Sequence, residues 1–170
     1  MNSVMTVRGL TRRFGNFLAL DALSFDLHRG CITGLLGLNG AGKSTTLSLL
    51  TGNLVPDSGE ISFAGDASPS GSATLRGRFG YLPEGAPLFE DLTVKAHLDT
   101  MAGLQGLKSE ARRDSIKKMM ARFELERVAH QIIDTLSKGY RRRVALAAAC
   151  LGDPEILILD EPTDGLDPFQ

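Results

Sequence analysis

Apolar and polar residues alternate in the first part of the chain as they do in a half-buried strand. Leu23, Phe25 and Leu27 alternate with polar neighbours, which gives the two-residue period of a strand with one face on a core. Residues 31–36 are more continuously apolar, and this pattern predicts a strand that is covered on both faces. Further short strands are predicted at residues 61–63 and 79–82. We therefore expect the N-terminal half to be rich in strands.

The pattern becomes helical between residues 92 and 151. Ile116, Met119, Met120 and Phe123 recur at the spacing that places them on one helical face. Such a stripe is typical of a core or of a face that packs on a partner helix. An apolar strand returns at residues 156–159. Strands, a helical insert and a final strand predict an α/β fold with a mainly parallel sheet.

Composition and charge exclude several classes of protein. The chain has 170 residues, of which 42% are hydrophobic and 23% charged, as in an ordinary folded domain. Its longest apolar run, residues 144–151, is far shorter than the ~18 residues that cross a membrane. The net charge of −1 gives no sign of nucleic-acid binding, and we expect no such partner. Residues 151–170, however, hold six carboxylates and no basic residue, which favours a cation site.

Residues 37–44 match the phosphate-binding pattern G-x-x-x-x-G-K-[ST]. A predicted strand precedes the motif, and a predicted helix from about Lys43 to Leu50 follows it, with Gly52 as its stop. Glycines let backbone N–H groups turn toward an anion, and the helix N-terminus adds partial positive charge. We expect Lys43 to bind the β- and γ-phosphates of a nucleotide and Ser44 to bind Mg²⁺. The alternative is a glycine turn with a chance lysine. The predicted nucleotide-binding residues of this segment are Gly37, Asn39, Gly40, Ala41, Gly42, Lys43, Ser44 and Thr45.

A pair of carboxylates follows the apolar strand at residues 156–159. Asp160 comes directly after the strand, where a carboxylate can hold a metal ion, often through water. Glu161 is then suited to orient or deprotonate an attacking water, and we predict it to be the catalytic residue. Alone, such a pair is more often a solvated strand end. Together with the motif at 37–44, it indicates a site for nucleotide hydrolysis.

A third motif, Leu136-Ser137-Lys138-Gly139-Tyr140, opens an alanine-rich helix shortly before that strand. Ser137 is a natural N-cap, and a helix N-terminus with a nearby glycine is a potential phosphate site, although an ordinary capped helix is the alternative. In this order the three motifs resemble ATP-binding cassette (ABC) domains, whose signature is usually L-S-G-G-Q. Lys138 and Tyr140 depart from that signature, whereas Leu136, Ser137 and Gly139 match it.

Further segments support the resemblance. Phe14 falls where ABC domains place an aromatic ring against adenine, with a core phenylalanine as the alternative. Residues 163–167 follow the carboxylate pair as the family's D-loop does. Glu84 stands where the family has the glutamine of its Q-loop, and its carboxylate can likewise offer oxygen to Mg²⁺ or to water. Residues 81–84 and 136–140 look most like the ATP-binding subunits of bacterial ABC-2-type exporters, including gliding-motility and multidrug relatives.

The resemblance implies a P-loop NTPase fold with an N-terminal antiparallel strand region and a helical insert. It implies an ATPase that uses ATP and Mg²⁺ to drive export, with Ser137 and Gly139 facing the ATP of a second ABC domain in a head-to-tail dimer. Glu84 and the helices between residues 92 and 133 are expected to meet a membrane permease, on the cytoplasmic face of the cell membrane. The alternatives are a soluble ABC ATPase in assembly or repair, and a non-catalytic nucleotide-binding remnant.

The resemblance also predicts the organisation of the chain. We expect one ABC domain, composed of a strand-rich part at 1–87, a helical part with the signature at 88–151, and the carboxylate strand with the D-loop at 152–170. ABC domains continue past the D-loop with another strand and a switch histidine, and the histidines here all precede the carboxylate strand. On this basis the domain is expected to be incomplete at its C-terminus, and the 170 residues alone are expected to be inactive.

Overall fold

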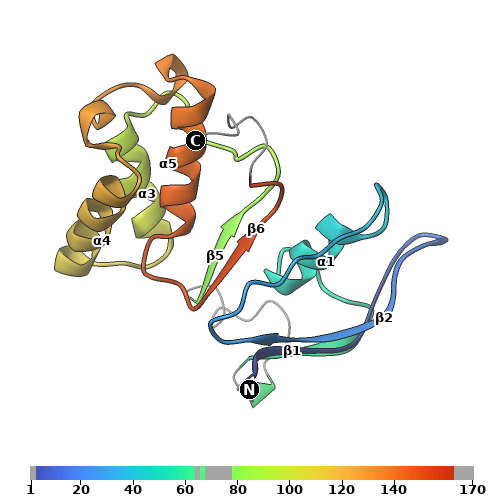
Figure 1. The fold of residues 1–170 in the computed structure, drawn as a ribbon. Helices are drawn as coiled ribbons and strands as arrows, with labels where there is room; N and C mark the ends of the chain where they lie inside the picture. The colour runs from blue at the N-terminus through green and yellow to red at the C-terminus, as the bar shows by residue number, and fades with distance from the viewer. Residues whose placement is uncertain (1–2, 64–65, 68–77, 163–170) are drawn as a thin grey trace. The chain divides into compact units, whose positions relative to one another are not determined.

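The computed structural model describes residues 3–63, 66–67 and 78–162. The chain forms two compact units, Met1–Arg76 and Gly77–Gln170, and each is considered by itself (Figure 1). The D-loop match at 163–167 lies outside the described residues, as does most of the segment 64–77. The predicted division of the chain at residues 87 and 151 stays a prediction.

The first unit consists of an antiparallel sheet and one helix. Its elements are β1 (Ser3–Phe14), β2 (Phe17–His28), α1 (Lys43–Leu50), β3 (Ser58–Phe63) and β4 (Asp66–Ala67). The strands pair in the order β2-β1-β3-β4. The predicted alternation falls in β2, where Leu23, Phe25 and Leu27 are half-buried while Ser24 and Asp26 are exposed. The core of this unit is apolar and includes Met5, Val7, Leu10, Leu49, Ile61 and Phe63.

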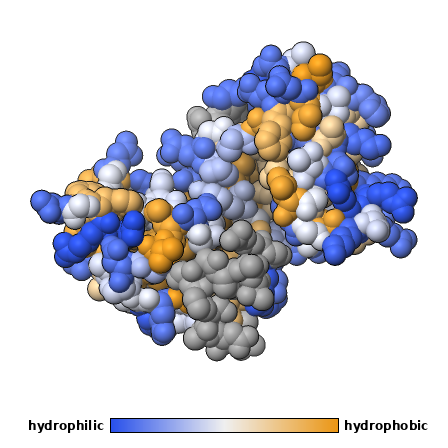
Figure 2. Space-filling model, turned by 180° about the vertical axis from the view of Figure 1, so that it is seen from behind, coloured by the Kyte–Doolittle hydropathy of each residue, from blue (hydrophilic) through white to orange (hydrophobic). Residues whose placement is uncertain are grey.

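Residues 31–36 differ from the prediction. They form none of the strand pairs in the described part of the chain, and Ile32 and Leu36 are 103% and 93% exposed. The prediction of a strand covered on both faces is wrong for this structure. An apolar sequence favours burial, but a strand also requires neighbouring strands whose backbone groups complete its ladder. Figure 2 shows patches of apolar surface among the polar residues on one face.

The second unit combines a parallel strand pair with three longer helices. Its elements are β5 (Phe79–Leu82), α3 (Val94–Leu104), α4 (Ser109–Arg122), short 3-10 helices at Glu126–Val128 and Ile133–Thr135, α5 (Lys138–Ala149) and β6 (Ile156–Leu159). β5 and β6 are parallel, and Leu82 lies opposite Leu159. The carboxyl ends of both strands therefore lie at the same edge.

The three helices enclose a common apolar core. Figure 1 shows α3, α4 and α5 side by side, and the contacts among them agree. Ile116, Met119 and Met120 are buried in the cluster that holds Leu98 of α3 and Val144 of α5. The predicted stripe is thus a core face, as its spacing indicates. Among the described residues, no helix is both long and apolar enough to span a bilayer.

Candidate functional site

The glycine-rich segment 37–44 leads directly into α1, which begins and ends where the sequence predicts. Gly40 and Gly42 have φ angles of 82° and 86°, in the left-handed region that favours glycine. A Cβ atom on Gly42 would lie 2.5 Å from the carbonyl oxygen of Ala19 on β2. Position 42 therefore requires glycine for two reasons: the left-handed backbone and the close approach of β2.

The N-terminus of α1 has the properties of an anion site. Gly42 is the N-cap, no side chain caps the helix, and its first turn contains no acidic residue. The first N–H groups of a helix have no partner within the helix, and the helix dipole adds partial positive charge there. Phosphate oxygens can satisfy both features.

Lys43 lies over its own loop. Its ammonium Nζ donates to the carbonyl oxygens of Gly37 and Leu38, at 2.9 and 3.0 Å. These are neutral, exposed acceptors, which phosphate oxygens can replace as stronger charge-assisted partners. The hydroxyl-bearing Ser44 is exposed, and Thr45 beside it is half-buried. Asn39 and Ala41 are also exposed, so the predicted set lies on one accessible loop and helix start.

A buried threonine that the motif analysis did not single out anchors this helix start. Thr46 is 1% exposed, and its Oγ1 donates to the carbonyl oxygen of Gly42 at 2.9 Å. This bond ties the first turn of α1 to the residue that begins it. A threonine in an apolar helix carries no sequence signal for such a role.

Phe14, at the end of β1, is 45% exposed, which argues against the alternative of a core phenylalanine. The guanidinium carbon of Arg12 lies 5.0 Å from the centre of its ring. Arg12 is held in turn by hydrogen bonds to Asp57 and to the carbonyl oxygen of Val55, both at 3.0 Å. A partly exposed ring, braced by a cation, is suited to stack on a flat ligand.

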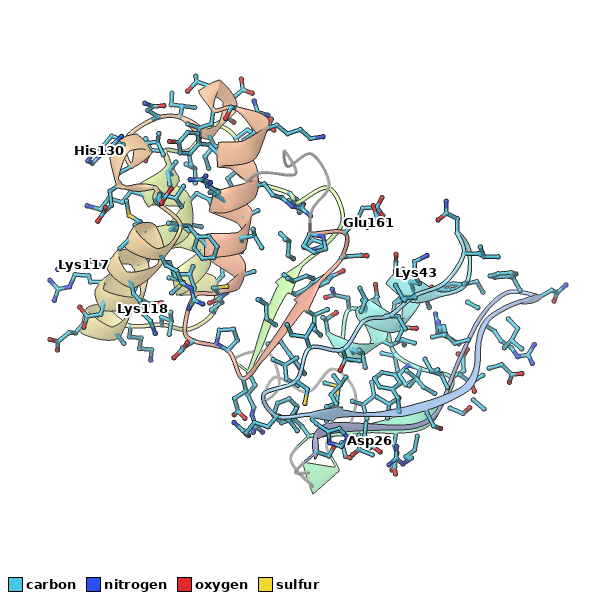
Figure 3. All side chains as sticks on the ribbon, in the orientation of Figure 1. Asp26, Lys43, Lys117, Lys118, His130 and Glu161 are labelled. Atoms are coloured by element: carbon cyan, nitrogen blue, oxygen red, sulfur yellow. The ribbon has the colours of Figure 1, made fainter. Side chains whose placement is uncertain are left out.

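In the second unit, Asp160 continues the strand pair beyond β6. Its N–H donates to the carbonyl oxygen of Leu82 at 2.8 Å, and the residue is 8% exposed. Glu161 follows with an exposed side chain and a φ angle of 46° (Figure 3). Glu84 is exposed and comes two residues after β5. The structure thus places Glu84, Asp160 and Glu161 after the carboxyl ends of two neighbouring strands.

The signature segment forms a capped helix start, as the sequence predicts. The Ser137 hydroxyl accepts the N–H of Tyr140 at 3.4 Å, and α5 begins at the next residue, Lys138. Ser137 is exposed, Gly139 is half-buried, and the first turn of α5 contains no acidic residue. A contact that the sequence did not suggest comes from the same helix. Arg142 is buried and donates to the backbone carbonyls of Glu161 and Pro162.

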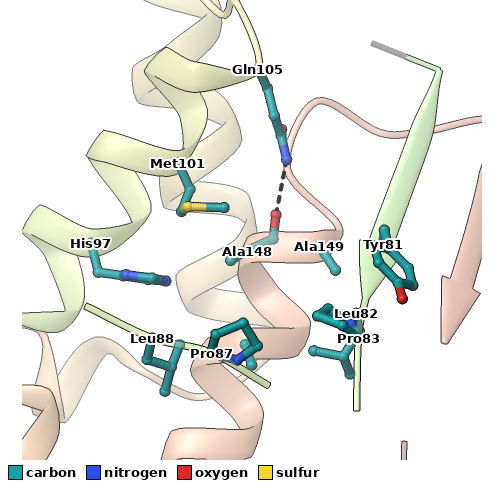
Figure 4. A pocket seen from close by; sticks show the side chains of 11 residues that line it. Tyr81, Leu82, Pro83, Pro87, Leu88, His97, Met101, Gln105, Ala148 and Ala149 are labelled. Carbon is teal, nitrogen blue, oxygen red and sulfur yellow. Dashed lines mark hydrogen bonds between the residues drawn. The ribbon is translucent and has the colours of Figure 1, made fainter. Parts of the chain in front are cut away.

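A separate cavity of about 200 Å³ lies in the second unit, between β5 and helices α3 and α5 (Figure 4). Its lining is mainly apolar and contains none of the predicted nucleotide-binding residues. His97 lines it at 2% exposure, and burial lowers the pKa of its imidazole. Its Nδ1 accepts the N–H of Phe89 at 3.4 Å, which requires an unprotonated nitrogen.

Comparison with known proteins decides the family. A family model described as "ABC transporter" matches residues 20–164. The chain belongs to the ABC transporter family. Membership places it among nucleotide-binding ATPase domains of transporters, and the antiparallel N-terminal sheet, parallel strand pair and helical insert confirm the predicted α/β fold class.

Among curated relatives, this ABC domain is 40% identical over 167 residues to the "Probable multidrug ABC transporter ATP-binding protein YbhF" of Escherichia coli (strain K12). It is 41% identical over 161 residues to the "Nod factor export ATP-binding protein I" of Burkholderia lata. These alignments cover 98% and 95% of this chain, but the chain spans only 29% and 53% of the length of those relatives.

Solved structures agree with the assignment. The ATP-binding subunit of an ABC transporter is 35% identical, with a TM-score of 0.86, over 98% of this chain and 69% of that one. The cbiO1 protein of Clostridium perfringens, part of the ABC transporter complex cbiONQ, is 30% identical with a TM-score of 0.85. That match covers 99% of this chain and 69% of cbiO1.

The residues of this domain fit both ATP and Mg²⁺. The uncapped start of α1 and the Lys43 ammonium offer N–H donors to phosphate. Each unit, considered by itself, offers oxygen donors of the kind that Mg²⁺ takes together with water and substrate phosphates: the Ser44 hydroxyl in the first, and the Asp160 and Glu84 carboxylates in the second. Within the described residues no cluster of three or more His, Cys, Asp or Glu side chains could hold a metal ion.

Proposed function

We propose that this chain is the ATP-binding part of an ABC exporter, in which ATP binding and hydrolysis drive transport. The observation that carries the proposal is the start of α1. There, left-handed glycines, a lysine and an uncapped helix N-terminus without acidic residues lie on one segment, and this combination supports phosphate binding. The names of two relatives, a probable multidrug transporter and a Nod factor exporter, favour export as the direction.

Each candidate residue has a distinct chemical role in this proposal. Lys43 and the N–H groups at the start of α1 bind the β- and γ-phosphates of ATP. Ser44, Asp160 and Glu84 hold Mg²⁺ directly or through water. Bound Mg²⁺ neutralises charge on the phosphates during transfer. Glu161 orients the attacking water and accepts its proton, for which its exposed carboxylate is suited.

Recognition of the base is assigned to Phe14. The exposed part of its ring stacks on adenine, while Arg12 braces the ring. Stacking on an aromatic ring contributes affinity without reading the edge of the base. Base selectivity is therefore weak in this proposal.

The proposed partners are a second ABC domain and a membrane permease. Ser137 and Gly139, at the accessible start of α5, contact the ATP of the second domain in a head-to-tail dimer. Glu84 and the helices between residues 92 and 133 meet the permease, on the cytoplasmic face of the membrane. The permease is expected to co-purify with the full-length protein from detergent-solubilised membranes.

Phosphate release by the full-length protein tests the catalytic part of the proposal. The wild-type protein should hydrolyse ATP only with Mg²⁺, and Glu161→Gln should lower kcat by ~10²–10⁴-fold, the contribution of a general base. Fluorescent-ATP binding should persist in that variant. Glu60→Gln, at an exposed glutamate on β3, is the matched control and should keep wild-type turnover. Unchanged turnover in Glu161→Gln would assign the base to another residue.

A further inference from the structure

Arg142 of α5 is buried with its guanidinium on backbone oxygens. The residue is 6% exposed, and its Nε donates to the carbonyl oxygen of Pro162 at 2.9 Å. Its Nη2 donates to the carbonyl oxygen of Glu161. Within the described residues it forms no ion pair with a carboxylate. A buried charge is costly unless hydrogen bonds compensate, so these two carbonyls are what stabilises the guanidinium in place.

The neighbouring arginines on α5 behave differently. Arg141 pairs with Glu90 at 3.3 Å and with Asp134 at 3.1 Å, and Arg143 pairs with Glu124 at 2.9 Å. All three acidic partners are largely exposed. Of three consecutive arginines, only Arg142 is directed at the turn that follows β6.

The turn that Arg142 holds has a conformation that its own sequence disfavours. Glu161 has a φ angle of 46°, in the left-handed region that non-glycine residues rarely adopt. The proline at 162 further restricts Glu161 and favours an extended backbone at that position. Such a conformation persists where the surroundings hold it. A planar guanidinium that donates to two successive carbonyls is suited to do so.

The same turn leaves the Glu161 carboxylate available. The side chain is exposed, and none of the hydrogen bonds in the described part of the chain involves its carboxylate. A fixed backbone with an unengaged carboxylate is what a general base on water requires, because its direction is set before the ligand arrives.

We propose that Arg142 is a positioning residue that holds the backbone of Glu161 and so aims its carboxylate at the attacking water. This inference rests on the proposed function, in which Glu161 acts on that water. In this proposal Arg142 acts through Glu161 and is not itself a catalytic residue. Arg142 lies on the helix that Ser137 caps, so its hydrogen bond to Glu161 connects the signature helix to the proposed catalytic glutamate.

A double-mutant cycle in the full-length protein tests the inference. Arg142→Gln should lower kcat by about ten- to a hundredfold, as misplacement of a catalytic group by ~1 Å does, while the Kd for fluorescent ATP changes less than about threefold. In single-turnover release of labelled phosphate, Arg142→Gln should cause no further loss when it is added to Glu161→Gln. Arg8→Gln, at an exposed arginine on β1 that has no proposed role, controls for the loss of positive charge and should leave kcat unchanged.

Arg142→Lys keeps the inference testable if Arg142→Gln does not fold. Lysine retains the positive charge but not the forked pair of N–H donors, so kcat of Arg142→Lys should lie between the wild-type and Arg142→Gln values. If Arg142→Gln is unfolded, the expected result is a kcat of Arg142→Lys below that of the wild type. If Arg142→Gln lowers kcat by the same factor in the wild type and in Glu161→Gln, Arg142 does not act through Glu161. That result overturns the proposed role of Arg142 and leaves the role of Glu161 unaffected. Full turnover in Glu161→Gln overturns the proposed role of Glu161, and this inference with it.

Discussion

The starts of α1 and α5 are both free of acidic residues, yet they are capped differently. At α1 the N-cap is Gly42 in the left-handed region, and no side chain accepts a hydrogen bond from the helix. At α5 the N-cap is Ser137 with an extended backbone, and its hydroxyl accepts the N–H of Tyr140. One helix start leaves its N–H groups to an outside partner, whereas the other satisfies one of them itself.

The two caps indicate which helix start is suited to bind an anion. Both helix dipoles favour negative charge, but only α1 also has a left-handed glycine and a lysine folded over its loop. The α5 start is first of all a stable helix end. We infer that α1 binds the phosphates within one chain, and that α5 adds a contact only when a second domain is present.

Removal of the lysine at each helix start should change ATP affinity very differently, and the loss at α1 should exceed every other effect considered below. Lys43→Ala removes the ammonium over the phosphate loop and should weaken ATP binding about ten- to a hundredfold, from the loss of a charge-assisted contact worth ~1.5–3 kcal/mol. Lys138→Ala at α5 should change the affinity of the monomer less than about threefold, because its helix start binds no phosphate within one chain. Fluorescent-ATP titration of both variants measures this. Equal losses of affinity in the two variants would contradict the claim that only the α1 start binds phosphate within one chain.

A second test separates strain from collision in the phosphate loop. Gly40→Ala introduces strain alone, because φ is 82° and a Cβ there would meet nothing within 4 Å. Gly42→Ala adds a collision with the Ala19 carbonyl oxygen to a similar strain. Each left-handed non-glycine residue costs ~1–3 kcal/mol, so Gly42→Ala should lower the free energy of unfolding more than Gly40→Ala does. Urea unfolding with equal midpoints for the two variants would contradict the close approach at Gly42.

Removal of the cap at α5 should have a smaller effect. Ser137→Ala leaves the Tyr140 N–H without its partner and should cost about 1 kcal/mol of unfolding free energy. Ser44→Ala at α1 removes an exposed hydroxyl that caps nothing, so the free energy of unfolding should change by less than ~0.5 kcal/mol. Thermal or urea unfolding without ligand measures both. The contrast fails if Ser44→Ala destabilises as much as Ser137→Ala.

The smallest effect is a pH dependence confined to the unit that contains α5. Burial lowers the pKa of His97 below its ordinary 6.5, so the unfolded state takes up a proton at a higher pH than the folded state does. The free energy of unfolding should therefore fall as the pH drops below about 6.5. His97→Gln should flatten this slope, whereas His130→Gln, at an exposed histidine, should retain it. The unfolding free energy is measured at about pH 5.5 and 7.5 in each variant. If the difference between the two pH values is the same in the wild type and in His97→Gln, burial of His97 does not cause the pH dependence.

Local patterns predicted the parts of the fold that depend on nearby residues. The bounds of α1, its stop at Gly52 and the cap at Ser137 follow from glycine and serine chemistry within a few positions. The methionine stripe of α4 follows from helical spacing. These predictions succeed because the interactions that decide them are close in sequence.

The sequence could not predict what depends on distant partners. Residues 31–36 are apolar enough for a strand, but strand pairing is decided by other segments. Arg142 looks like one more basic residue among three, and its contact with Glu161 joins positions 19 residues apart. The left-handed backbone of Glu161 is likewise absent from the motif, since the following proline favours an extended conformation.

The claim that the start of α1 binds the nucleotide is tested most directly by NMR of the backbone N–H groups at both helix starts during ATP titration. The full-length protein, labelled with ¹⁵N-glycine and ¹⁵N-lysine, is titrated at a concentration where gel filtration shows a monomer. We predict large, saturable chemical-shift changes for Gly40, Gly42 and Lys43, and unchanged signals for Lys138 and Gly139. Shifts at Lys138 and Gly139 with none at Gly40, Gly42 and Lys43 would contradict the claim that α1 binds the nucleotide.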